Sequence, residues 1–400
     1  MTQLVTKQVC IVGGGPAGAL LGLLLAKQGV EVLVVERHST FKREFRGETI
    51  AAGSVAILEE LGLLQTLKQS GYIRVNCIEM FEREKLLFRA DFEQFKHKQK
   101  FGIDMPQPIV LKTIIDEAFK YPNFQIMMGT TCTELLEQNG QAVGVMCKQG
   151  DDLFEVHSQL IVGADGRYGK MRDMAGLEAT IKKLQRDLVW FKLPRPENWS
   201  HSNIIKVNRN NHLVILPTFP DMLRVGTYIP KGGYLKIRQQ GVEEFREMVS
   251  EIEPAFKDML EKHVTSWSDL VMLDIFTANA HQWSRDGLIL IGDAAHTLSP
   301  VLGQGVNIAM QDAVELAPHV VKYLHENVGK TMPRDALLTF ERDRKKTVEF
   351  VQSFQERQEE TLAAKTSFGT FLRRMKMRTL HRLPWKMKIM SKLQHGIQYK

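Results

Sequence analysis

Four short apolar runs, each followed by glycines or an acidic residue, stand out in the pattern of hydrophobic and polar positions. They cover residues 9–12, 30–35, 160–162 and 288–291. Unbroken runs of Val, Ile and Leu predict strands buried on both faces, as in a parallel sheet covered by helices. An apolar stretch at 19–26 has the length of a helix, so the first run opens a strand–turn–helix unit.

The middle of the chain follows a different pattern, in which short β-type runs alternate with turn residues and predict an antiparallel sheet. These runs cover residues 188–193, 204–207, 212–216 and 223–229. Hairpin turns are expected at Asn139-Gly140 and Asn210-Asn211. Helices are expected at 54–67, 113–119, 242–259 and 306–323, with further helices to about residue 365.

The first apolar run leads into Gly-Gly-Gly-Pro-Ala-Gly at residues 13–18. A strand before these glycines and a helix after them match the dinucleotide-binding fingerprint. Gly13 is expected to allow the tight turn, Gly15 to let the backbone approach a pyrophosphate, and Gly18 to let the helix pack on the strand. Glu36 ends the second run, at the position where an acidic residue of a dinucleotide-binding fold contacts the ribose hydroxyls. It would repel a 2′-phosphate, so FAD or NAD fits better than NADP.

Two further motifs follow later strands. Asp165 lies in Gly-Ala-Asp-Gly at 163–166, where it either contacts a ligand or closes an Asx turn. Asp293 lies in Gly-Asp-Ala-Ala-His at 292–296, at the sheet edge where open α/β folds bind ligands. Its carboxylate can accept hydrogen bonds from sugar-alcohol hydroxyls.

A glycine-containing loop follows the third motif and leads into a helix that starts near Val306 and Asn307. Glycines at 303 and 305 let this loop press against a flat ring. The helix N-terminus offers N–H groups and positive charge, which favours the negative charge of a reduced flavin. In this order and spacing, the three motifs predict one extended ligand, FAD.

Composition and charge narrow the class of protein. Apolar residues make up 44% and charged residues 25% of the 400 residues, as in soluble globular proteins. The four cysteines lack the spacing of metal ligands, so we expect reduced thiols, no metal site and a cytoplasmic protein. We expect no signal peptide and no membrane-spanning stretch.

The net charge of +7 is concentrated in the C-terminal tail. Ten basic residues and no acid follow Glu360, and without these ten the 53 basic residues fall below the 46 acidic ones. This argues against nucleic-acid binding by the main domains. Pro384 is expected to divide the tail into two helices. The tail is either a basic amphipathic segment that binds membranes weakly and peripherally, or a pair of helices packed on the domain.

These segments predict an α/β fold, with an FAD-binding Rossmann-like three-layer domain, an inserted mostly β substrate domain and a helical C-terminus. We assign residues 1–75, 100–180 and 275–365 to the discontinuous FAD-binding domain, 76–99 and 181–274 to the substrate-binding sheet domain, and 366–400 to the basic helical tail.

With its three motifs in order over about residues 7–365, the chain resembles the FAD-dependent aromatic hydroxylases of the para-hydroxybenzoate hydroxylase type, which are single-component flavin monooxygenases. The resemblance implies Arg46 near the cofactor and Pro300 beside the reactive face of the flavin, both as catalytic residues that also contact the cofactor. The other cofactor-binding residues that we expect are Gly13, Gly15, Pro16, Ala17, Gly18, Glu36, Arg37, Gln107, Cys132, Asp165, Gly292, Asp293, Gly303, Gly305, Val306 and Asn307.

The resemblance also implies the activity. The enzyme would use NAD(P)H and O2 to hydroxylate an aromatic or lipid-like small molecule through a flavin hydroperoxide, in a site that excludes water. NAD(P)H would bind transiently near Asp165 and the loop of Arg46. The alternatives are a flavin-dependent reductase of a polyprenyl-type substrate, a flavin halogenase and a non-catalytic dinucleotide-binding regulator. The chain lacks the Trp-x-Trp-x-Ile-Pro segment that flavin halogenases share.

The substrate pocket is expected on the inserted sheet, with His212, Leu213, Ile215 and Tyr228 as its candidate residues. A phenolic substrate would benefit from a base that removes its proton. His212, Tyr228 and His296 are candidates for this base, although a lone histidine is more often a packing residue. The sequence does not choose among them.

Overall fold

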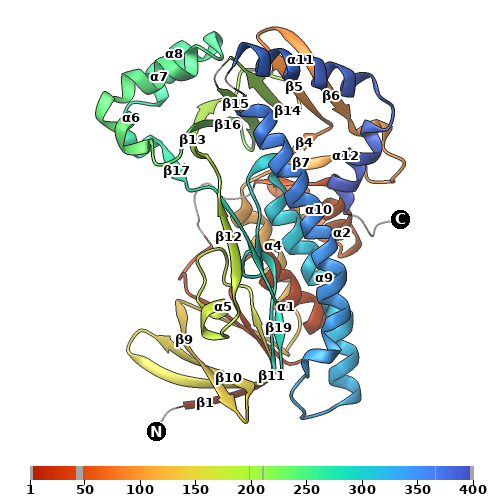
Figure 1. Ribbon diagram of the computed structural model, residues 1–400. Helices are drawn as coiled ribbons and strands as arrows, with labels where there is room; N and C mark the ends of the chain where they lie inside the picture. Colours follow the sequence, from red (N-terminus) through yellow and green to blue (C-terminus); the bar gives the residue numbers. More distant parts are fainter. Residues whose placement is uncertain (1–2, 42–47, 198, 210, 365, 397–400) are drawn as a thin grey trace.

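The computed structural model describes residues 3–41, 48–197, 199–209, 211–364 and 366–396. The molecule is elongated, with one large sheet towards each end and the long helices α9 (Gln304–Glu326) and α10 (Leu338–Leu362) running along its length (Figure 1). The N-terminus lies at the end formed by the first sheet. The C-terminal helices lie against the second sheet.

The first sheet contains the predicted dinucleotide-binding unit. Its strand order is β19-β20-β11-β1-β2-β8, and the β20/β11, β11/β1, β1/β2 and β2/β8 pairs are parallel. Because parallel strands end at the same edge, this order brings the three sequence motifs together. The strands are β1 Gln3–Val12, β2 Val32–Glu36, β8 Phe124–Met128, β11 Asp152–Gly163, β19 Ser284–Arg285 and β20 Leu288–Leu290.

Helices cover this sheet, and a hairpin extends it. Helix α1 (Pro16–Lys27) packs between the sheet and helices α4 (Gln107–Ala118) and α9. Strands β9 (Thr130–Gln138) and β10 (Gln141–Gln149) form the predicted hairpin, with Asn139 and Gly140 at φ 51° and 77°. Such positive φ values are required by a two-residue hairpin turn. The short helix α5 (Met171–Met174) follows β11.

The second sheet has the order β17-β13-β16-β15-β14-β5-β6. Strands β5 and β6 come from early in the chain, and β5 pairs in parallel with β14, so Ser202 lies opposite Cys77. The strands are β5 Cys77–Glu82, β6 Lys85–Asp91, β13 Arg186–Pro194, β14 Ser202–Val207, β15 His212–Thr218, β16 Met222–Pro230 and β17 Val271–Leu273. The hairpin turn expected at Asn210-Asn211 includes residue 210, which is outside the described residues, although β14 and β15 pair antiparallel as expected.

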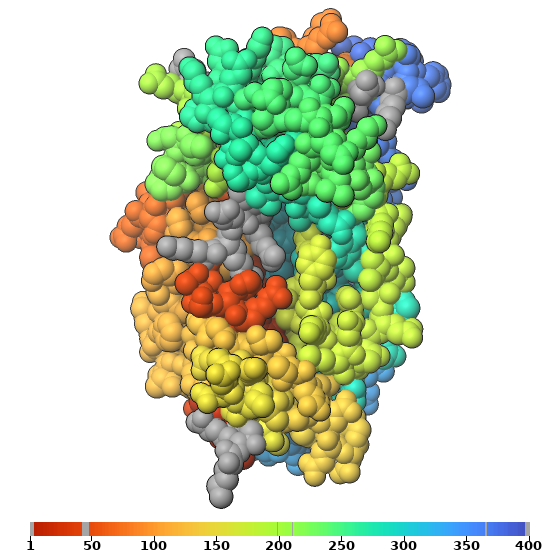
Figure 2. Space-filling view, turned by 90° about the vertical axis from the view of Figure 1, so that its left-hand side faces the viewer, coloured from red at the N-terminus to blue at the C-terminus, as the bar shows by residue number. Residues whose placement is uncertain are grey.

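Three helices cover the outer face of the second sheet: α6 (Tyr234–Gln240), α7 (Val242–Ser250) and α8 (Lys257–His263). Figure 2 shows them in green at one end of the molecule, opposite the yellow β9–β10 hairpin. The single helix expected at 242–259 is wrong, because Pro254 separates α7 from α8. The helix expected at 54–67 is likewise two helices, α2 (Ala52–Glu60) and α3 (Leu64–Ser70), separated by Gly62 at φ 75°.

Two small sheets lie between the large ones, and the C-terminal helices close the structure. The small sheets are β3-β7-β4 (Thr49–Ile50, Gly102–Asp104 and Ile73–Val75) and β12-β18-β21 (Ala179–Lys183, Phe276–Ala280 and His296–Thr297). Pro384 separates α11 (Ser367–Arg382) from α12 (Lys386–His395), as predicted. No helix in the described part of the chain is both long enough and apolar enough to span a membrane.

Candidate active site

A cavity of about 400 Å³ lies between the motif edge of the first sheet and the inner face of the second. Its walls include most of the residues expected to bind the cofactor. These are Gly13, Gly15, Pro16, Ala17, Glu36, Arg37, Gln107, Cys132, Asp165, Gly292, Asp293, Pro300, Gly303, Gly305 and Val306. Arg46 lies outside the described residues. Gly18 and Asn307 do not line the cavity, and other contacts explain both.

The glycines of the first motif have different tasks. A Cβ atom on Gly13 would lie 2.3 Å from the carbonyl oxygen of Ala164, and one on Gly18 would lie 1.9 Å from that of Gly13. These two glycines are therefore required by the close packing of the turn. Around Gly15, no atom lies within 4 Å of such a Cβ position, so this residue borders open space at the start of α1. That space suits a pyrophosphate at a helix N-terminus.

Glu36 holds the glycine turn in place. Its carboxylate is buried at the end of β2 and accepts hydrogen bonds from the backbone N–H groups of Gly14 (2.8 Å) and His38 (2.9 Å). It also borders the cavity. The contact with ribose hydroxyls stays a prediction.

Asp165 closes a turn with one carboxylate oxygen and leaves the other oxygen without a partner among the described residues. One carboxylate oxygen accepts a hydrogen bond from the N–H of Met171 (2.9 Å) and so closes the turn after β11. The other oxygen is buried and has no hydrogen bond with a described residue. Burial raises the pKa of this carboxyl above its ordinary value. An unpaired buried acceptor in the cavity wall fits a ligand hydroxyl group.

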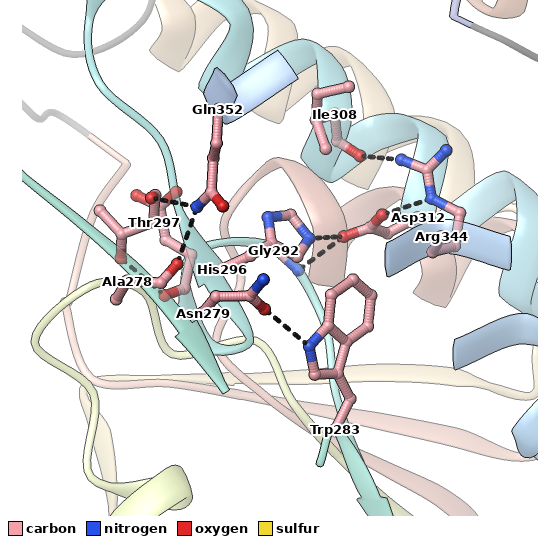
Figure 3. A network of polar contacts seen from close by, with 11 residues as sticks. Ala278, Asn279, Trp283, Gly292, His296, Thr297, Ile308, Asp312, Arg344 and Gln352 are labelled. Carbon is pink, nitrogen blue, oxygen red and sulfur yellow. Dashed lines mark hydrogen bonds and ion pairs between the residues drawn. The ribbon is translucent and has the colours of Figure 1, made fainter. Parts of the chain in front are cut away.

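The third motif is held from behind by a buried ionic network (Figure 3). Asp312 of α9 accepts hydrogen bonds from the N–H of Gly292 (2.8 Å) and from Nε of Arg344 (2.8 Å), and it lies 2.6 Å from Nε2 of His296. Although burial opposes ionisation, His296 and Arg344 hold the pKa of Asp312 below its ordinary value. His296 is therefore part of this network and is not among the residues that line the cavity, and its role as a base stays a prediction. The network fixes the strand end that presents Asp293 to the cavity, where its carboxylate lies 3.4 Å from Nε of Arg167.

The loop after this motif bends sharply into α9. Leu302 (φ 62°, ψ 13°) and Gly303 (φ 60°, ψ 34°) are both left-handed, which costs roughly 1 kcal/mol or more for a leucine. Strain of this kind is frequent at ligand sites. The side chain of Asn307 stabilises the bend, since it accepts from the N–H of Ala51 (2.8 Å) and donates to the carbonyl oxygens of Thr49 and Gly303. The side chain of Asn307 is thus used to hold the backbone, and the predicted contact of this helix N-terminus with the cofactor stays a prediction.

The inner face of the second sheet forms the other wall. His212 and Tyr228 line the cavity, as predicted, together with Trp190. Leu213 and Ile215 do not, because alternate residues of β15 point to opposite faces and these two pack against the α6–α8 side. The prediction that they line the pocket is therefore wrong. The alternation could have been read from the sequence once His212 was assigned to the inner face.

A buried polar cluster, absent from the sequence predictions, lies where the second sheet meets the small sheet β3-β7-β4. Arg224 of β16 is 3.8 Å from the carboxylate of Glu48, and its guanidinium lies 4.3 Å from the ring centroid of Trp190. Glu48, Arg224 and Asn203 border the cavity. Asp104 is fully buried beside them, and the side chains of Thr49 and Asn203 lie close to its carboxyl. No local motif marks these residues, because they come from four separate elements.

The stability of the protein should therefore depend on the ionisation of Asp104. Burial raises its pKa from 3.8 to about 7, and the negative charge of Glu48 contributes to this rise. The positive charge of Arg224 and the polar side chains of Thr49 and Asn203 lower it by less. When the pKa of a carboxyl is higher in the folded than in the unfolded protein, folding becomes less favourable as the pH rises from the unfolded-state pKa to the folded-state pKa. We expect the free energy of unfolding of Asp104→Asn, relative to the unmodified protein, to grow by about 2 to 4 kcal/mol from about pH 4 to about pH 8.

Chemical denaturation at several pH values would measure this difference. Asp187→Asn is the matched control, because Asp187 is also buried but lies 2.8 Å from Nζ of Lys231. Burial alone would raise the pKa of Asp187, but the hydrogen bond from Lys231 and two backbone N–H groups hold it below its ordinary value of 3.8. Its carboxyl is therefore ionised in both the folded and the unfolded state above about pH 4, and the relative stability of its variant should stay level from there to about pH 8. The same trend in both variants would contradict the assignment.

The residues around the cavity fit FAD. The open space at Gly15, the unpaired oxygen of Asp165 and the carboxylate of Asp293 follow one another along the motif edge. This succession matches an extended dinucleotide that ends at the loop of Pro300. Burial also raises the pKa of the Cys132 thiol to about 12, so this residue of the cavity wall is unreactive.

The chain belongs to the family described as FAD binding domain, which matches residues 6–355. With this membership, the predicted fold and the predicted class of enzyme, an FAD-dependent monooxygenase, are confirmed. One relative is the 6-methylpretetramide 4-monooxygenase of Streptomyces rimosus, 34% identical over 313 residues, which span 78% of this chain and 74% of the relative.

Two more distant proteins show the range of this fold. A pyrrole-2-carbonyl-[peptidyl-carrier protein] brominase of Pseudoalteromonas luteoviolacea is 23% identical over 83% of this chain and 81% of its own. The crystal structure of p-nitrophenol 4-monooxygenase PnpA from Pseudomonas putida superposes with a TM-score of 0.82 at 18% identity, over 99% of this chain and 100% of PnpA. At that identity the superposition supports the fold alone.

Proposed function

We propose that this chain hydroxylates an aromatic small molecule bearing oxygen substituents, with NAD(P)H as the source of electrons and O2 as the source of oxygen. The observation that carries the proposal is the pairing of the FAD motifs with an apolar aromatic wall in one cavity. Trp190 and Tyr228 supply flat rings on that wall, and Val214 and Leu216 supply apolar contacts. The relative that acts on 6-methylpretetramide supports a monooxygenase of this kind.

Charged groups beside both rings restrict the substrate further. The guanidinium of Arg224 lies 4.3 Å from the ring centroid of Trp190, and that of Arg186 lies 4.5 Å from the ring centroid of Tyr228. Of these two arginines, Arg224 lines the cavity, so a planar substrate that stacks between apolar side chains would place a polar oxygen near it. This favours an oxygenated aromatic ring system over a purely hydrocarbon or polyprenyl substrate.

The residues of this chain would bind the cofactor, orient the substrate and exclude water from the site. Bound FAD supplies the redox chemistry, by taking electrons from NAD(P)H and activating O2. Asp293, the glycine turn at Gly15 and the loop of Pro300 would hold the cofactor. The inner face of the second sheet would place the substrate ring against it. Burial of this wall excludes water, which suppresses the loss of activated oxygen as hydrogen peroxide.

The test is oxidation of NADH and NADPH in air by the FAD-bound protein, with phenols, hydroxylated anthraquinones and polyprenyl phenols as substrates. Hydrogen peroxide would be quantified, and products would be analysed by mass spectrometry under ¹⁸O2. We expect one aromatic class to stimulate oxidation and to gain a single ¹⁸O atom with little peroxide. A product that gains two hydrogens instead would identify a reductase. Absence of any turnover would favour the non-catalytic regulator and overturn the proposal.

A halogenase is the second candidate, because the brominase relative covers 83% of this chain. The chain has no Trp-x-Trp-x-Ile-Pro segment, which disfavours it. Repeating the assay with bromide and chloride separates the two chemistries, since only a halogenase makes a product whose mass depends on the added halide.

We also propose that the C-terminal helices bring the protein weakly to anionic membranes. Helices α11 and α12 pack on the domain and bury Met377, Met390 and Leu393. An apolar row nevertheless stays exposed on α11, at a spacing that repeats along one helix face. Its members are Phe368, Phe371, Leu372 and Met375. Exposed basic residues, among them Arg378 and Arg382, flank the row, and a basic surface with exposed apolar side chains suits an anionic bilayer.

A double variant, Phe371→Glu with Leu372→Glu, should lose most of its binding to phosphatidylglycerol vesicles in a sedimentation assay and keep its thermal stability. Both residues are about half exposed, at 51% and 47%, so the fold should tolerate the change. Phe119→Glu is the matched control, since Phe119 is 58% exposed on the other domain and should not affect binding. Equal vesicle binding by all three proteins would contradict this proposal.

A further inference from the structure

His212 is a buried imidazole at the start of β15, in the wall of the cavity. Its ring stacks on the ring of Tyr228, with centroids 4.3 Å apart and planes at 28°. Nδ1 of His212 lies 3.3 Å from a terminal nitrogen of Arg186. Arg186 is itself fixed by Glu359 of α10, whose carboxylate accepts from its Nε at 2.8 Å. The imidazole is therefore oriented by a chain of two charged residues and by a stacked ring.

These contacts determine which nitrogen of His212 carries the proton. Burial lowers the pKa of the imidazole well below its ordinary value, and the positive charges of Arg186 and Arg373 lower it further, so the ring is neutral. An arginine can only donate hydrogen bonds, so Nδ1 must be the acceptor. The hydrogen of the neutral ring is then on Nε2. That atom is buried and has no hydrogen-bond partner among the described residues.

An unpaired buried donor destabilises the folded protein, and in a native protein it calls for an explanation. A ligand that supplies an acceptor would remove this cost. A charged oxygen accepts a stronger hydrogen bond from such a donor than a neutral oxygen does. The site therefore selects an oxygen with free lone pairs, and a phenolate or enolate oxygen above a neutral hydroxyl.

We propose, resting on the proposed function, that Nε2–H of His212 donates a hydrogen bond to a carbonyl, phenolate or enolate oxygen of the aromatic substrate and so fixes the orientation of its ring. Arg186 and Glu359 act as positioning residues for this donor. In this role His212 is not the base that accepts a substrate proton, because its only free nitrogen already carries hydrogen. The substrate class is then an aromatic compound with an acidic hydroxyl or a conjugated carbonyl group.

The test uses alizarin, a dihydroxyanthraquinone whose colour reports its ionisation, bound to the full-length FAD-containing protein. The absorbance of the bound dye is followed as the pH is varied. We expect the bound dye to ionise at a pH lower than the free dye by about one unit, which is a tenfold change in the ionisation constant. In His212→Phe, which keeps the ring stacked on Tyr228 but removes the donor, the transition should return towards that of the free dye, and affinity should fall about tenfold.

Two further variants separate hydrogen bonding from a structural role. His212→Gln retains an N–H donor and should recover part of the shift. Val214→Ala changes the same wall of β15 without a polar atom, so it should weaken binding and leave the ionisation pH unchanged. FAD content and melting temperature, measured on every variant, identify any protein that has lost its fold.

The proposal is overturned if alizarin does not bind to the unmodified protein, if its ionisation is unchanged on binding, or if His212→Phe behaves like the unmodified protein. The readout does not depend on turnover. A shift that depends on His212 in a protein with no monooxygenase activity would therefore support the binding site and contradict the proposed function. Hydroxylation without any shift in the ionisation of the dye would support the proposed function and contradict the role of His212.

Discussion

An Asp293→Ala variant is expected to be isolated without its yellow cofactor. Asp293 is presented to the cavity at the end of a strand that the Asp312 network holds rigidly. We expect its carboxylate to accept hydrogen bonds from the hydroxyl groups of the ribityl chain, and each hydrogen bond to a charged group contributes about 1.5 to 3 kcal/mol. Loss of one or two such bonds should weaken FAD binding by about 100-fold or more.

The measurement is the FAD content after purification, followed by titration of the apoprotein with FAD by fluorescence. Asp173→Ala is the control, since the side chain of Asp173 is 77% exposed, at the end of helix α5. Asp293→Asn should fall between the two, because a carboxamide can still accept a hydrogen bond. An alanine variant that keeps FAD with unchanged affinity would show that the third motif does not bind the ribityl chain.

A Gly15→Leu variant should be folded but unable to bind FAD. Gly15 has φ −74° and ψ −173°, which any residue adopts, and the position of an added side chain is empty. The leucine side chain would occupy the space that the pyrophosphate requires at the start of α1. We expect FAD affinity to fall more than about 100-fold, whereas the melting temperature of the apoprotein should change by only about 2 °C.

Gly18→Ala is the contrasting variant. Its Cβ would lie 1.9 Å from the carbonyl oxygen of Gly13, so the strand and the helix would have to move apart. Overpacking of this kind costs about 1 to 3 kcal/mol or more, and the apoprotein itself should be destabilised. If Gly15→Leu bound FAD normally, the pyrophosphate would have to lie elsewhere. If Gly18→Ala were as stable as the unmodified protein, the packing role of Gly18 would be wrong.

The features that the sequence predicted correctly are those that a few neighbouring residues encode. The buried strands and the glycine turn at residues 13–18 depend on side-chain type and backbone freedom over short distances, and the hairpin at Asn139-Gly140 requires two positive φ angles. Pro384 ends a helix through its own ring. Helix boundaries were less certain, because Gly62 and Pro254 end helices inside longer helical patterns.

In the candidate site, too, the residues of local motifs could be predicted from the sequence, whereas contacts between distant segments could not. The glycine and aspartate motifs could be read from the sequence because they follow strands that end at one sheet edge. The pairing of Glu48 with Arg224 joins residues 176 positions apart and depends on the arrangement of two sheets. Likewise, Asp312 and Arg344 assign His296 to a structural network that no spacing indicates.

By itself, then, the sequence determined the kind of cofactor, the strand–turn–helix unit that binds it and the presence of a second sheet, since each follows from local backbone geometry and hydrophobic periodicity. The tertiary structure alone decided the protonation of His212, the burial of Asp104 and the residues that meet across the cavity. These properties depend on desolvation and on charges from distant elements, which are set only when the sheets and helices have packed together.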